Sequence, residues 1–245
     1  MEGYDETTYG ERFADVYDDW YGSITDTEAC VEAVARLADG GPVLELGVGT
    51  GRLAIPLAQR GIQVTGVDAS PAMLAALSDK PGGDAVEAVL GDMTDPPVGD
   101  RRFAVVFVAY NTLFNLVTVD GQRTCLANAA RRLQPGGCVA IEAFVPDVSD
   151  AATDSVVPKR VSADQVVLSV SQQDPVRQEI IGQYIDISET GIRLRPWHIR
   201  WSTPEQLDVL AAEAGLHLSQ RWASWSGDDF DDTSTSHISV YRIAD

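Results

Sequence analysis

The sequence predicts a doubly wound α/β fold that carries an inserted antiparallel β-sheet. Two patterns support this prediction. Short apolar strands alternate with helix-like segments between residues 42 and 144, which is typical of parallel βαβ units with right-handed crossovers. Residues 165–201 instead alternate apolar and polar side chains, which is typical of antiparallel strands. A chain of 245 residues has room for one large domain with such an insertion.

The elements of the first half are expected in a regular order. Aromatic and apolar side chains recur at helical spacing from Tyr9 to Tyr21, and a second helix is expected over residues 26–37. The predicted strands then span residues 42–46, 63–67, 85–90, 103–108 and 138–144, and the predicted helices span residues 52–60, 71–77 and 121–133. Ser70 is the expected N-cap of the second of these helices, and the Pro-Gly-Gly stretch at residues 135–137 is expected to end the last one.

The alternation of strands and helices ends after Pro146. Residues 147–154 are polar and acidic, and we expect them to form a loop. Three inserted strands are expected over residues 165–171, 178–187 and 192–201, followed by a helix over 204–214 and two strands over 216–222 and 236–243. Thr203 is expected to cap that helix and Gly215 to end it.

Charge and composition restrict the function. The 37 acidic and 18 basic residues give a formal net charge of -19, which disfavours binding to nucleic acid or to anionic membranes. The N-terminus lacks the apolar segment of a signal peptide, and no apolar run is long enough to span a bilayer. Cys30, Cys125 and Cys138 are not spaced as metal ligands, so we expect no metal site and a cytoplasmic location.

A glycine-rich turn follows the first predicted strand. There the chain runs into Gly47, Gly49 and Gly51, whose missing Cβ atoms let a ligand approach the backbone. The helix behind them presents free N–H groups. The dinucleotide-binding fingerprint has its third glycine one position later, where Arg52 stands, so the turn suits a ligand without a pyrophosphate. Glu45 lies inside the strand, near where an ammonium group can bind.

Two carboxylates follow the next predicted strands. Asp68 ends the second strand, where a carboxylate can accept hydrogen bonds from both hydroxyls of a ribose. Asp92 follows the third strand, where a carboxylate can accept the exocyclic amine of adenine while the N–H of Met93 donates to a ring nitrogen. These groups and the glycine turn would surround one adenosine with a short polar tail. A helix cap at Asp68 and a plain turn at Asp92 are the alternatives.

Residues 42–144 resemble class I S-adenosylmethionine-dependent methyltransferases. Residues 45–51 look like the first motif of that family, Asp68 matches its ribose-binding acid, Asp92 matches its adenine pocket, and residues 133–137 look like its turn before the fifth strand. The resemblance implies a seven-stranded Rossmann-like methyltransferase sheet and S-adenosyl-L-methionine as the cofactor. The cofactor-binding residues that it implies are Tyr17, Glu45, Gly47, Val48, Gly49, Gly51, Arg52, Asp68, Ala69, Met73, Asp92, Met93 and Ala109.

A narrower resemblance extends to glycine and amino-sugar N-methyltransferases. Residues 9–21, residues 111–116 and the inserted strands look like parts of those enzymes, in which N-terminal tyrosines close over cofactor and substrate. The substrate-binding residues that it implies are Tyr9, Tyr21, Asn111, Phe114 and Asn115. Asn115 stands where an amino-sugar enzyme can place a histidine near the acceptor nitrogen. Alternatively, the tyrosines form a packed aromatic stripe and the asparagines cap a loop.

The predicted function is transfer of a methyl group to a nitrogen or oxygen of a small molecule, such as a sugar or a secondary metabolite, by in-line displacement. The candidates for a catalytic role are Tyr9, Asn115 and His198, none of which is a convincing general base. This favours nitrogen or an acidic hydroxyl as the acceptor, because a neutral amine needs no base. The alternatives are a non-catalytic module that binds S-adenosylmethionine, an NAD-dependent oxidoreductase and a nucleic-acid methyltransferase.

We expect the protein to be a monomer or a homodimer. Its chain is expected to have four parts. They are a helical cap over residues 1–40, a cofactor-binding core over 41–146, an antiparallel substrate roof over 147–201 and the C-terminal part of the core sheet over 202–245. A roof of that size suits a small or medium acceptor better than a macromolecule.

Overall fold

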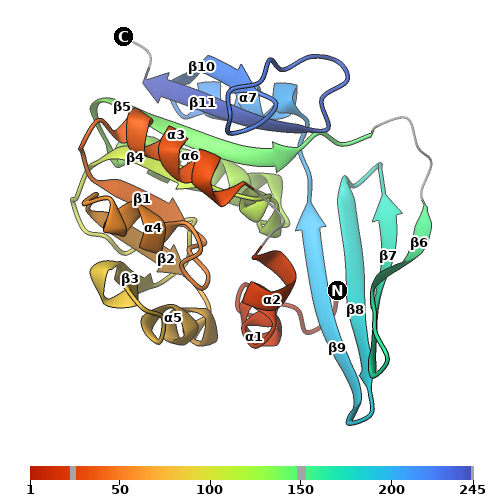
Figure 1. The fold of residues 1–245 in the computed structure, drawn as a ribbon. Helices are drawn as coiled ribbons and strands as arrows, with labels where there is room; N and C mark the ends of the chain where they lie inside the picture. Colours follow the sequence, from red (N-terminus) through yellow and green to blue (C-terminus); the bar gives the residue numbers. More distant parts are fainter. Residues whose placement is uncertain (23–25, 148–152, 244–245) are drawn as a thin grey trace.

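The computed structural model describes residues 1–22, 26–147 and 153–243, and a seven-stranded sheet forms its centre (Figure 1). The strands are β1 (Val43–Leu46), β2 (Val64–Asp68), β3 (Glu87–Leu90), β4 (Phe103–Val108), β5 (Leu133–Phe144), β10 (Leu216–Trp222) and β11 (Ser236–Ile243). Their order is β10-β11-β5-β4-β1-β2-β3, in which β1 to β5 are parallel and β11 is antiparallel to both of its neighbours. The direction of winding reverses between β1 and β4, the point at which sheets of this kind bind ligands.

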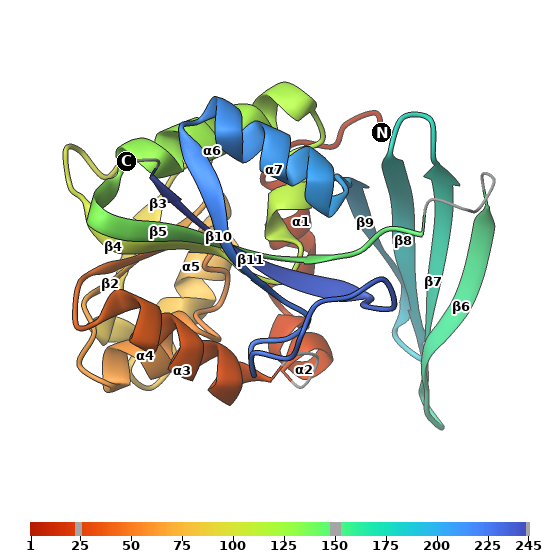
Figure 2. The same ribbon diagram turned by 90° about the horizontal axis from the view of Figure 1, so that it is seen from above.

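Helices cover both faces of this sheet (Figure 2). They are α1 (Thr8–Phe13), α2 (Tyr17–Tyr21), α3 (Thr27–Ala38), α4 (Ala54–Gln59), α5 (Pro71–Ser78), α6 (Val119–Arg131) and α7 (Pro204–Glu213), with the 3-10 turns η1 (Gly83–Ala85) and η2 (Thr112–Asn115). Alternate residues of β4 divide the core, because Val105 packs with side chains of α3 and α4 while Val106 packs with those of α6 and α7. The predicted doubly wound α/β sheet is confirmed.

A second, antiparallel sheet lies beside the first (Figures 1 and 2). Its strands are β6 (Asp154–Val161), β7 (Gln165–Asp174), β8 (Glu179–Ser188) and β9 (Gly191–Arg200), in that spatial order. Helices α1 and α2 lie between β9 and the carboxyl ends of the main-sheet strands (Figure 1). The predicted inserted sheet is therefore present, and α1 packs against both β9 and α5.

The helical spacing from Tyr9 to Tyr21 predicts one continuous helix, and this prediction is wrong. The structure has two short helices there, α1 and α2. The chain turns before α2 at Val16, whose φ of -124° and ψ of -4° are not helical. Asp15 in this turn binds two arginines of β9. Helical periodicity does not reveal a partner from a strand so far along the chain, and such tertiary contacts override local propensity.

The strands differ from the prediction at two places. Nearly every residue of β6 is exposed, so this strand lacks the apolar alternation by which strands are recognised, and it was missed. Strand β5 begins at Leu133, before the expected Pro-Gly-Gly turn, because Leu133 pairs with Phe103 and the ladder resumes at Cys138 after a bulge. Most of the loop predicted over residues 147–154 lies outside the described residues. Other boundaries differ by a few residues at element ends, as is usual.

The three cysteines pack as small apolar side chains. Cys30, Cys125 and Cys138 are buried and free, and burial raises the pKa of the Cys125 thiol to about 12. Among the described residues, no group of three or more His, Cys, Asp or Glu side chains is placed to hold a metal ion. In the same part of the chain, no helix is long and apolar enough to cross a membrane.

Candidate active site

A cavity of about 750 Å³, including the space that opens to solvent, lies where β1, β2 and β3 end beneath the N-terminal helices. We call it the strand-end cavity. Of the residues predicted to bind the cofactor, those that line it are Tyr17, Gly47, Gly49, Asp68, Ala69, Met73, Asp92 and Met93. Its other lining residues are Tyr4, Asp5, Glu6, Tyr9, Gly10, Val67, Gly91, Thr112, Asn115 and Leu116. The sequence motifs therefore converge on one space.

The glycine turn leaves bare backbone on the wall of this cavity. Gly47 has a φ of 75°, and a Cβ atom there would lie 2.3 Å from Cγ2 of Thr112. Gly49 has a φ of 54° and also lines the cavity. Gly51 instead packs against the core, because a Cβ atom on it would lie 2.9 Å from Cγ of Leu77. Gly47 and Gly49 thus present backbone to the cavity, whereas Gly51 lets Leu77 of α5 pack closely.

Asp68 presents its carboxylate at the end of β2. Its Oδ2 accepts the N–H of Gly49 at 2.8 Å, and its Oδ1 accepts the N–H of Ser70 at 2.9 Å. Each oxygen keeps further lone-pair capacity for a ligand. Burial raises the pKa of this carboxyl, although the backbone N–H groups oppose the shift. The N-cap of α5 is Ser70, whose Oγ accepts the N–H of Met73 at 3.2 Å. Asp68 is therefore not the N-cap of this helix.

Asp92 lies on the cavity wall after β3 and also shapes the local turn. Its Oδ1 accepts the N–H of Thr94 at 2.8 Å, and its Oδ2 accepts the Thr94 hydroxyl at 2.6 Å. The turn-forming role and the place in the cavity therefore coexist, because a carboxylate can accept more hydrogen bonds than these two.

Glu45 and Arg52 lie behind the glycine turn and do not line the cavity. Glu45 is only 3% exposed, and its Oε2 has no hydrogen-bond partner in the described part of the chain. Burial raises the pKa of Glu45 to about 8, and the nearby guanidinium of Arg52 partly opposes this shift. Arg52 also donates from Nη1 to the hydroxyl of Thr27 at 3.0 Å. A buried carboxyl oxygen without a hydrogen-bond partner is costly, which makes Glu45 responsive to any charge that enters the cavity.

A second cavity, of about 680 Å³, adjoins the first. We call it the tyrosine cavity. Its lining residues are Tyr9, Tyr17, Tyr21, Tyr110, Asn111, Thr112, Asn115, Phe144, Tyr184, Trp197 and Ile199. Tyr9, Tyr17, Thr112 and Asn115 line both cavities, so these four side chains mark the junction between them. Among the described residues, none that lines the tyrosine cavity is a carboxylate, an imidazole, an ammonium or a guanidinium.

Four tyrosines of this cavity, Tyr9, Tyr17, Tyr21 and Tyr110, have pKa values that keep their phenols neutral. Burial raises the pKa of Tyr9 and Tyr21 well above the ordinary value, because neighbouring tyrosines surround both hydroxyls. Burial also raises the pKa of Tyr17 to about 12, and that of Tyr110 to about 12. These hydroxyls can therefore donate and accept hydrogen bonds near neutral pH, but they are poor proton acceptors for a reaction.

Three carboxylates anchor the N-terminal segment over the cavities. Glu11 of α1 accepts from the Ser70 hydroxyl at 2.8 Å, which fixes α1 on α5. Asp18 of α2 accepts from the Thr50 hydroxyl at 2.7 Å, which fixes α2 beside the glycine turn. Asp15, between the two helices, accepts from a side chain of β9. One acidic side chain thus joins the N-terminal segment to each of α5, the glycine turn and β9.

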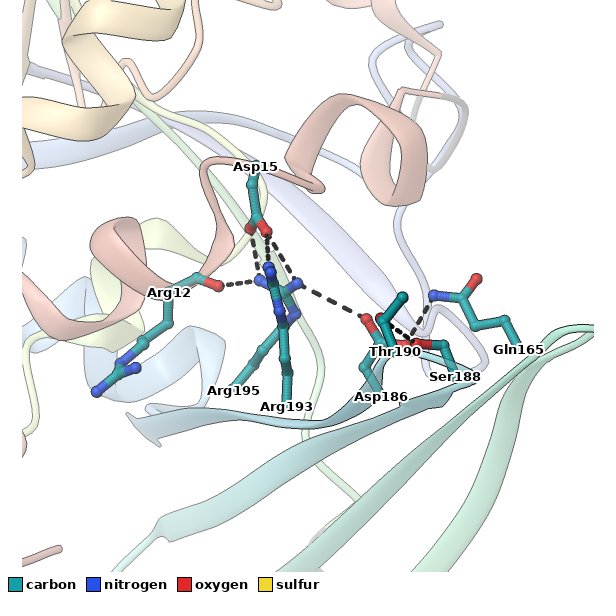
Figure 3. Close-up of polar contacts among 8 residues, drawn as sticks. All are labelled: Arg12, Asp15, Gln165, Asp186, Ser188, Thr190, Arg193 and Arg195. Carbon is teal, nitrogen blue, oxygen red and sulfur yellow. Dashed lines mark hydrogen bonds and ion pairs between the residues drawn. The ribbon is translucent and has the colours of Figure 1, made fainter.

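The anchor at Asp15 joins this segment to the second sheet (Figure 3). Arg195 of β9 donates to both carboxylate oxygens of Asp15, at 2.5 and 3.0 Å, and to the carbonyl of Arg12. Asp186 of β8 lies 3.7 Å from the same guanidinium. The Arg195 side chain is 5% exposed, whereas Arg193, which also contacts Asp15, is 72% exposed. Of the two arginines that pair with Asp15, Arg195 is therefore shielded from water and Arg193 is not.

Several predicted site residues lie away from both cavities. Phe114 is fully buried and packs edge-on against Phe144 with ring centroids 5.3 Å apart. His198 on β9 lies 3.6 Å from the Glu179 carboxylate, and burial lowers its pKa. Val48 and Ala109 are buried in the core. Periodicity does not show which side of a strand or turn faces a cavity.

Asn111 lines the tyrosine cavity and holds its wall in place. It has a φ of 63°, follows Tyr110 with a φ of 46°, and its Oδ1 accepts the N–H of Phe144 at 2.7 Å. The N–H of Tyr110 donates to the Glu142 carboxylate at 2.8 Å. Two successive left-handed residues without glycine are unusual, and β5 stabilises them through these two bonds.

The second sheet contributes aromatic residues that the sequence interpretation missed. Tyr184 of β8 and Trp197 of β9 line the tyrosine cavity, together with Ile199. Gly182 pairs with Trp197, and a Cβ atom there would lie 2.3 Å from the indole ring. A glycine inside a predicted strand is a signal of such a close approach. The alternation of Trp197 and Ile199 along β9 is a second signal.

Residues 43–137 match a family model described as a methyltransferase domain. The chain is similar to the CcbJ methyltransferase from Streptomyces caelestis, with 41% sequence identity and a TM-score of 0.91, over 99% of this chain and 100% of that one. It is also 29% identical to the cypemycin N-terminal methyltransferase from a Streptomyces species, over 92% of this chain and 94% of that protein. The sugar N-methyltransferase KedS8 from Streptoalloteichus shares the fold, at 20% identity and a TM-score of 0.68, over 94% of this chain and 92% of that one.

Proposed function

Since the chain belongs to the S-adenosylmethionine-dependent methyltransferases and S-adenosylmethionine is its cofactor, we propose that it methylates an amine nitrogen of a small molecule. The observation that carries this proposal is the composition of the tyrosine cavity. Hydroxyl, amide and aromatic side chains line it, and no basic or acidic side chain from the described part of the chain does. A neutral amine attacks without a base, whereas an ordinary hydroxyl gains much from one.

We assign the cofactor to the strand-end cavity. Gly47 and Gly49 line this cavity without a side chain, Asp68 offers a carboxylate for ribose hydroxyls, and Asp92 offers one for the adenine amine. Glu45 lies behind the turn and outside the cavity lining, and its oxygen without a hydrogen-bond partner would attract the ammonium of a methionine moiety. These residues fit S-adenosylmethionine, which supplies a methyl group on a sulfonium centre when it is bound.

The junction residues would align the acceptor. Tyr9, Tyr17 and Asn115 line both cavities, so an amine in the tyrosine cavity can meet a methyl group presented from the strand-end cavity. A neutral phenol can accept an N–H of the amine and leave its lone pair free for attack. Aromatic faces also stabilise nearby positive charge. The product ammonium then loses its proton to solvent.

The parts of the chain divide these roles in our proposal. The N-terminal segment covers both cavities, the main sheet carries the cofactor residues, and β8 and β9 supply the far wall of the tyrosine cavity. The cypemycin relative is named for methylation at an N-terminus, which supports nitrogen as the acceptor atom. Enclosure of the cavity by α2 and β8 favours a small acceptor over a large one.

Matched amine and alcohol acceptors test this proposal. The purified chain would be incubated with S-adenosylmethionine and either glucosamine or glucose, and either dialanine or lactoyl-alanine. Mass spectrometry would then detect the methylated product. We expect methylation of amines alone, and its loss in Asp68→Ala. Equal methylation of the alcohols would contradict the proposal, and binding of S-adenosylmethionine without turnover of any acceptor would favour a non-catalytic module.

A further inference from the structure

A third cavity, of about 780 Å³, adjoins the tyrosine cavity on the side of β6. We call it the cation pocket, because Lys159 and Arg160 lie on its wall. Tyr21, Tyr110 and Tyr184 line both this pocket and the tyrosine cavity. An acceptor with its amine at the junction to the cofactor can therefore extend past these three tyrosines toward the two cations.

A β-bulge turns both cations to the same pocket. Pro158 of β6 pairs with Leu168 of β7, but Arg160 pairs with Val167, so Lys159 is an extra residue in the ladder. Regular alternation would put Lys159 and Arg160 on opposite faces of the sheet. The bulge instead brings both to the wall that Val167, only 1% exposed, also lines. Bulges often re-aim a side chain next to a site.

These two cations have no partner of opposite charge within the described chain. Ion pairs occupy many of the other basic residues, such as Lys80 with Asp18 and Arg195 with Asp15. Among the described residues, none of the ion pairs includes Lys159 or Arg160. Lys159 and Arg160 are adjacent in a chain with 37 acidic and 18 basic residues. They repel each other unless an anion lies between them.

The rest of the pocket wall leaves room for such an anion. Asp19 of α2 is the one carboxylate among the lining residues, and no hydrogen bond or ion pair in the described chain joins it to either cation. The lining therefore carries one net positive charge. Trp20 adds an aromatic face, and the remaining wall is phenolic and apolar.

We propose that the cation pocket binds an anionic group, a carboxylate or a phosphate, at the end of the acceptor away from its methylated nitrogen. This inference rests on the proposed amine methylation. The planar guanidinium of Arg160 and the ammonium of Lys159 together suit the oxygens of either anion. Fixing the charged end determines which nitrogen of the acceptor reaches the junction, so the pocket orients the acceptor as well as holding it.

Protection of an edge strand is the competing role for these residues. Strand β6 is at the edge of its sheet, and lysine, proline and bulges on edge strands oppose aggregation. Lys159 and Arg160 are exposed, as that role requires, but both also line a cavity. The two roles predict different effects of the same substitution, on acceptor preference in one case and on self-association in the other.

Charge-matched acceptors test the inference. Methyl transfer and calorimetric binding, the latter with S-adenosylhomocysteine present, would be measured for glucosamine 6-phosphate against glucosamine, and for dialanine against its C-terminal amide. The proteins would be the unchanged chain, the double variant Lys159→Gln with Arg160→Gln, and the control Arg177→Gln. The control removes one charge from the turn between β7 and β8, where Arg177 is 68% exposed and outside the pocket.

We expect the unchanged chain to prefer the anionic member of a pair by about 10- to 100-fold, which corresponds to one or two charge-assisted hydrogen bonds. The preference should act through KM, vanish in the double variant and persist in Arg177→Gln. The pair with the larger preference identifies phosphate or carboxylate as the anion. A double variant that self-associates but keeps the preference would overturn the inference in favour of edge protection.

Methyl transfer and calorimetric binding, measured together, separate this inference from the proposed function. Turnover of amines without a charge preference overturns the anion pocket and leaves amine methylation standing. Charge-dependent binding that is lost in the double variant, without turnover, supports the pocket and contradicts amine methylation. Binding that does not depend on the anionic group overturns the inference, whatever the turnover.

Discussion

The substitution Asp15→Asn tests whether the N-terminal segment is held over the cavities by its ion pair with β9. It keeps the size of the side chain and removes the charge that faces Arg195 (Figure 3). Removing one partner of a buried ion pair costs about 3–5 kcal/mol. We expect about 2 kcal/mol here, since half of the Asp15 side chain is exposed, at 49%, and Asp186 still lies 3.7 Å from the guanidinium.

The expected loss can be measured as a thermal shift. For a chain of this size, about 2 kcal/mol lowers Tm by about 4–8 °C. The matched control is Arg193→Gln, which removes a 72% exposed partner of the same carboxylate and should cost less than about 1 kcal/mol. Calorimetry should show weaker binding of S-adenosylmethionine to the Asp15 variant, by at most about 30-fold, because Tyr9 and Tyr17 then cover the cofactor for less of the time.

The pH dependence supplies a second check on Asp15. The guanidinium of Arg195 holds the pKa of this carboxyl below its ordinary value of 3.8. Stability from a lowered pKa is fully present above the unfolded value and disappears as the pH falls through the folded one. The difference between the unchanged chain and Asp15→Asn should therefore persist at neutral pH and close below pH 3.8. Equal effects of Asp15→Asn and Arg193→Gln on Tm at neutral pH would refute this reasoning.

Three further substitutions test the strand-end cavity. Asp68→Ala should weaken binding of S-adenosylmethionine by about 100-fold or more in calorimetry, because two hydrogen bonds to a charged group are lost, and unchanged affinity would contradict the assignment. Gly47→Ala should abolish that binding and lower Tm more than Gly40→Ala does, since the two glycines have φ values of 75° and 79° but only Gly47 has the Thr112 side chain within reach of a new Cβ atom. Glu45→Gln should make the stability of the unliganded chain less dependent on pH between about 4.5 and 8 in denaturant titrations. In the unchanged chain, a raised carboxyl pKa means that stability falls as the pH rises through that window, and identical pH profiles would contradict a pKa of Glu45 that burial raises.

Most of the main sheet could be predicted from the sequence, because local patterns carry the information. The apolar run of β4 reflects burial on both faces, and Ser70 followed by Pro71 marks the start of α5. Asp68 was placed at the cavity because parallel strands end at one edge of the sheet. Such features depend on residues close together in the chain, where periodicity and cap chemistry apply.

The tyrosine cavity could be predicted only in part, because its walls meet from distant parts of the chain. The aromatic stripe of the N-terminal segment was visible, but its break at Asp15 depends on Arg195, which lies 180 residues further along. Strand β6 shows no apolar alternation because nearly all of it is exposed. Phe114 has the side chain of a binding residue, yet its direction is set by packing in the core. Tertiary contacts decide these features, and a local pattern does not contain them.

The most direct measurement of amine methylation is the pH dependence of kcat/KM for two amine acceptors of different pKa. The described residues offer no base in the tyrosine cavity, and burial keeps Tyr9 and Tyr17 neutral. The rising limb of the profile should therefore follow deprotonation of the acceptor itself and move by the difference between the two amine pKa values. A rising limb at the same pH for both amines would show that a group on the protein takes the proton, and it would contradict unassisted attack by a neutral amine.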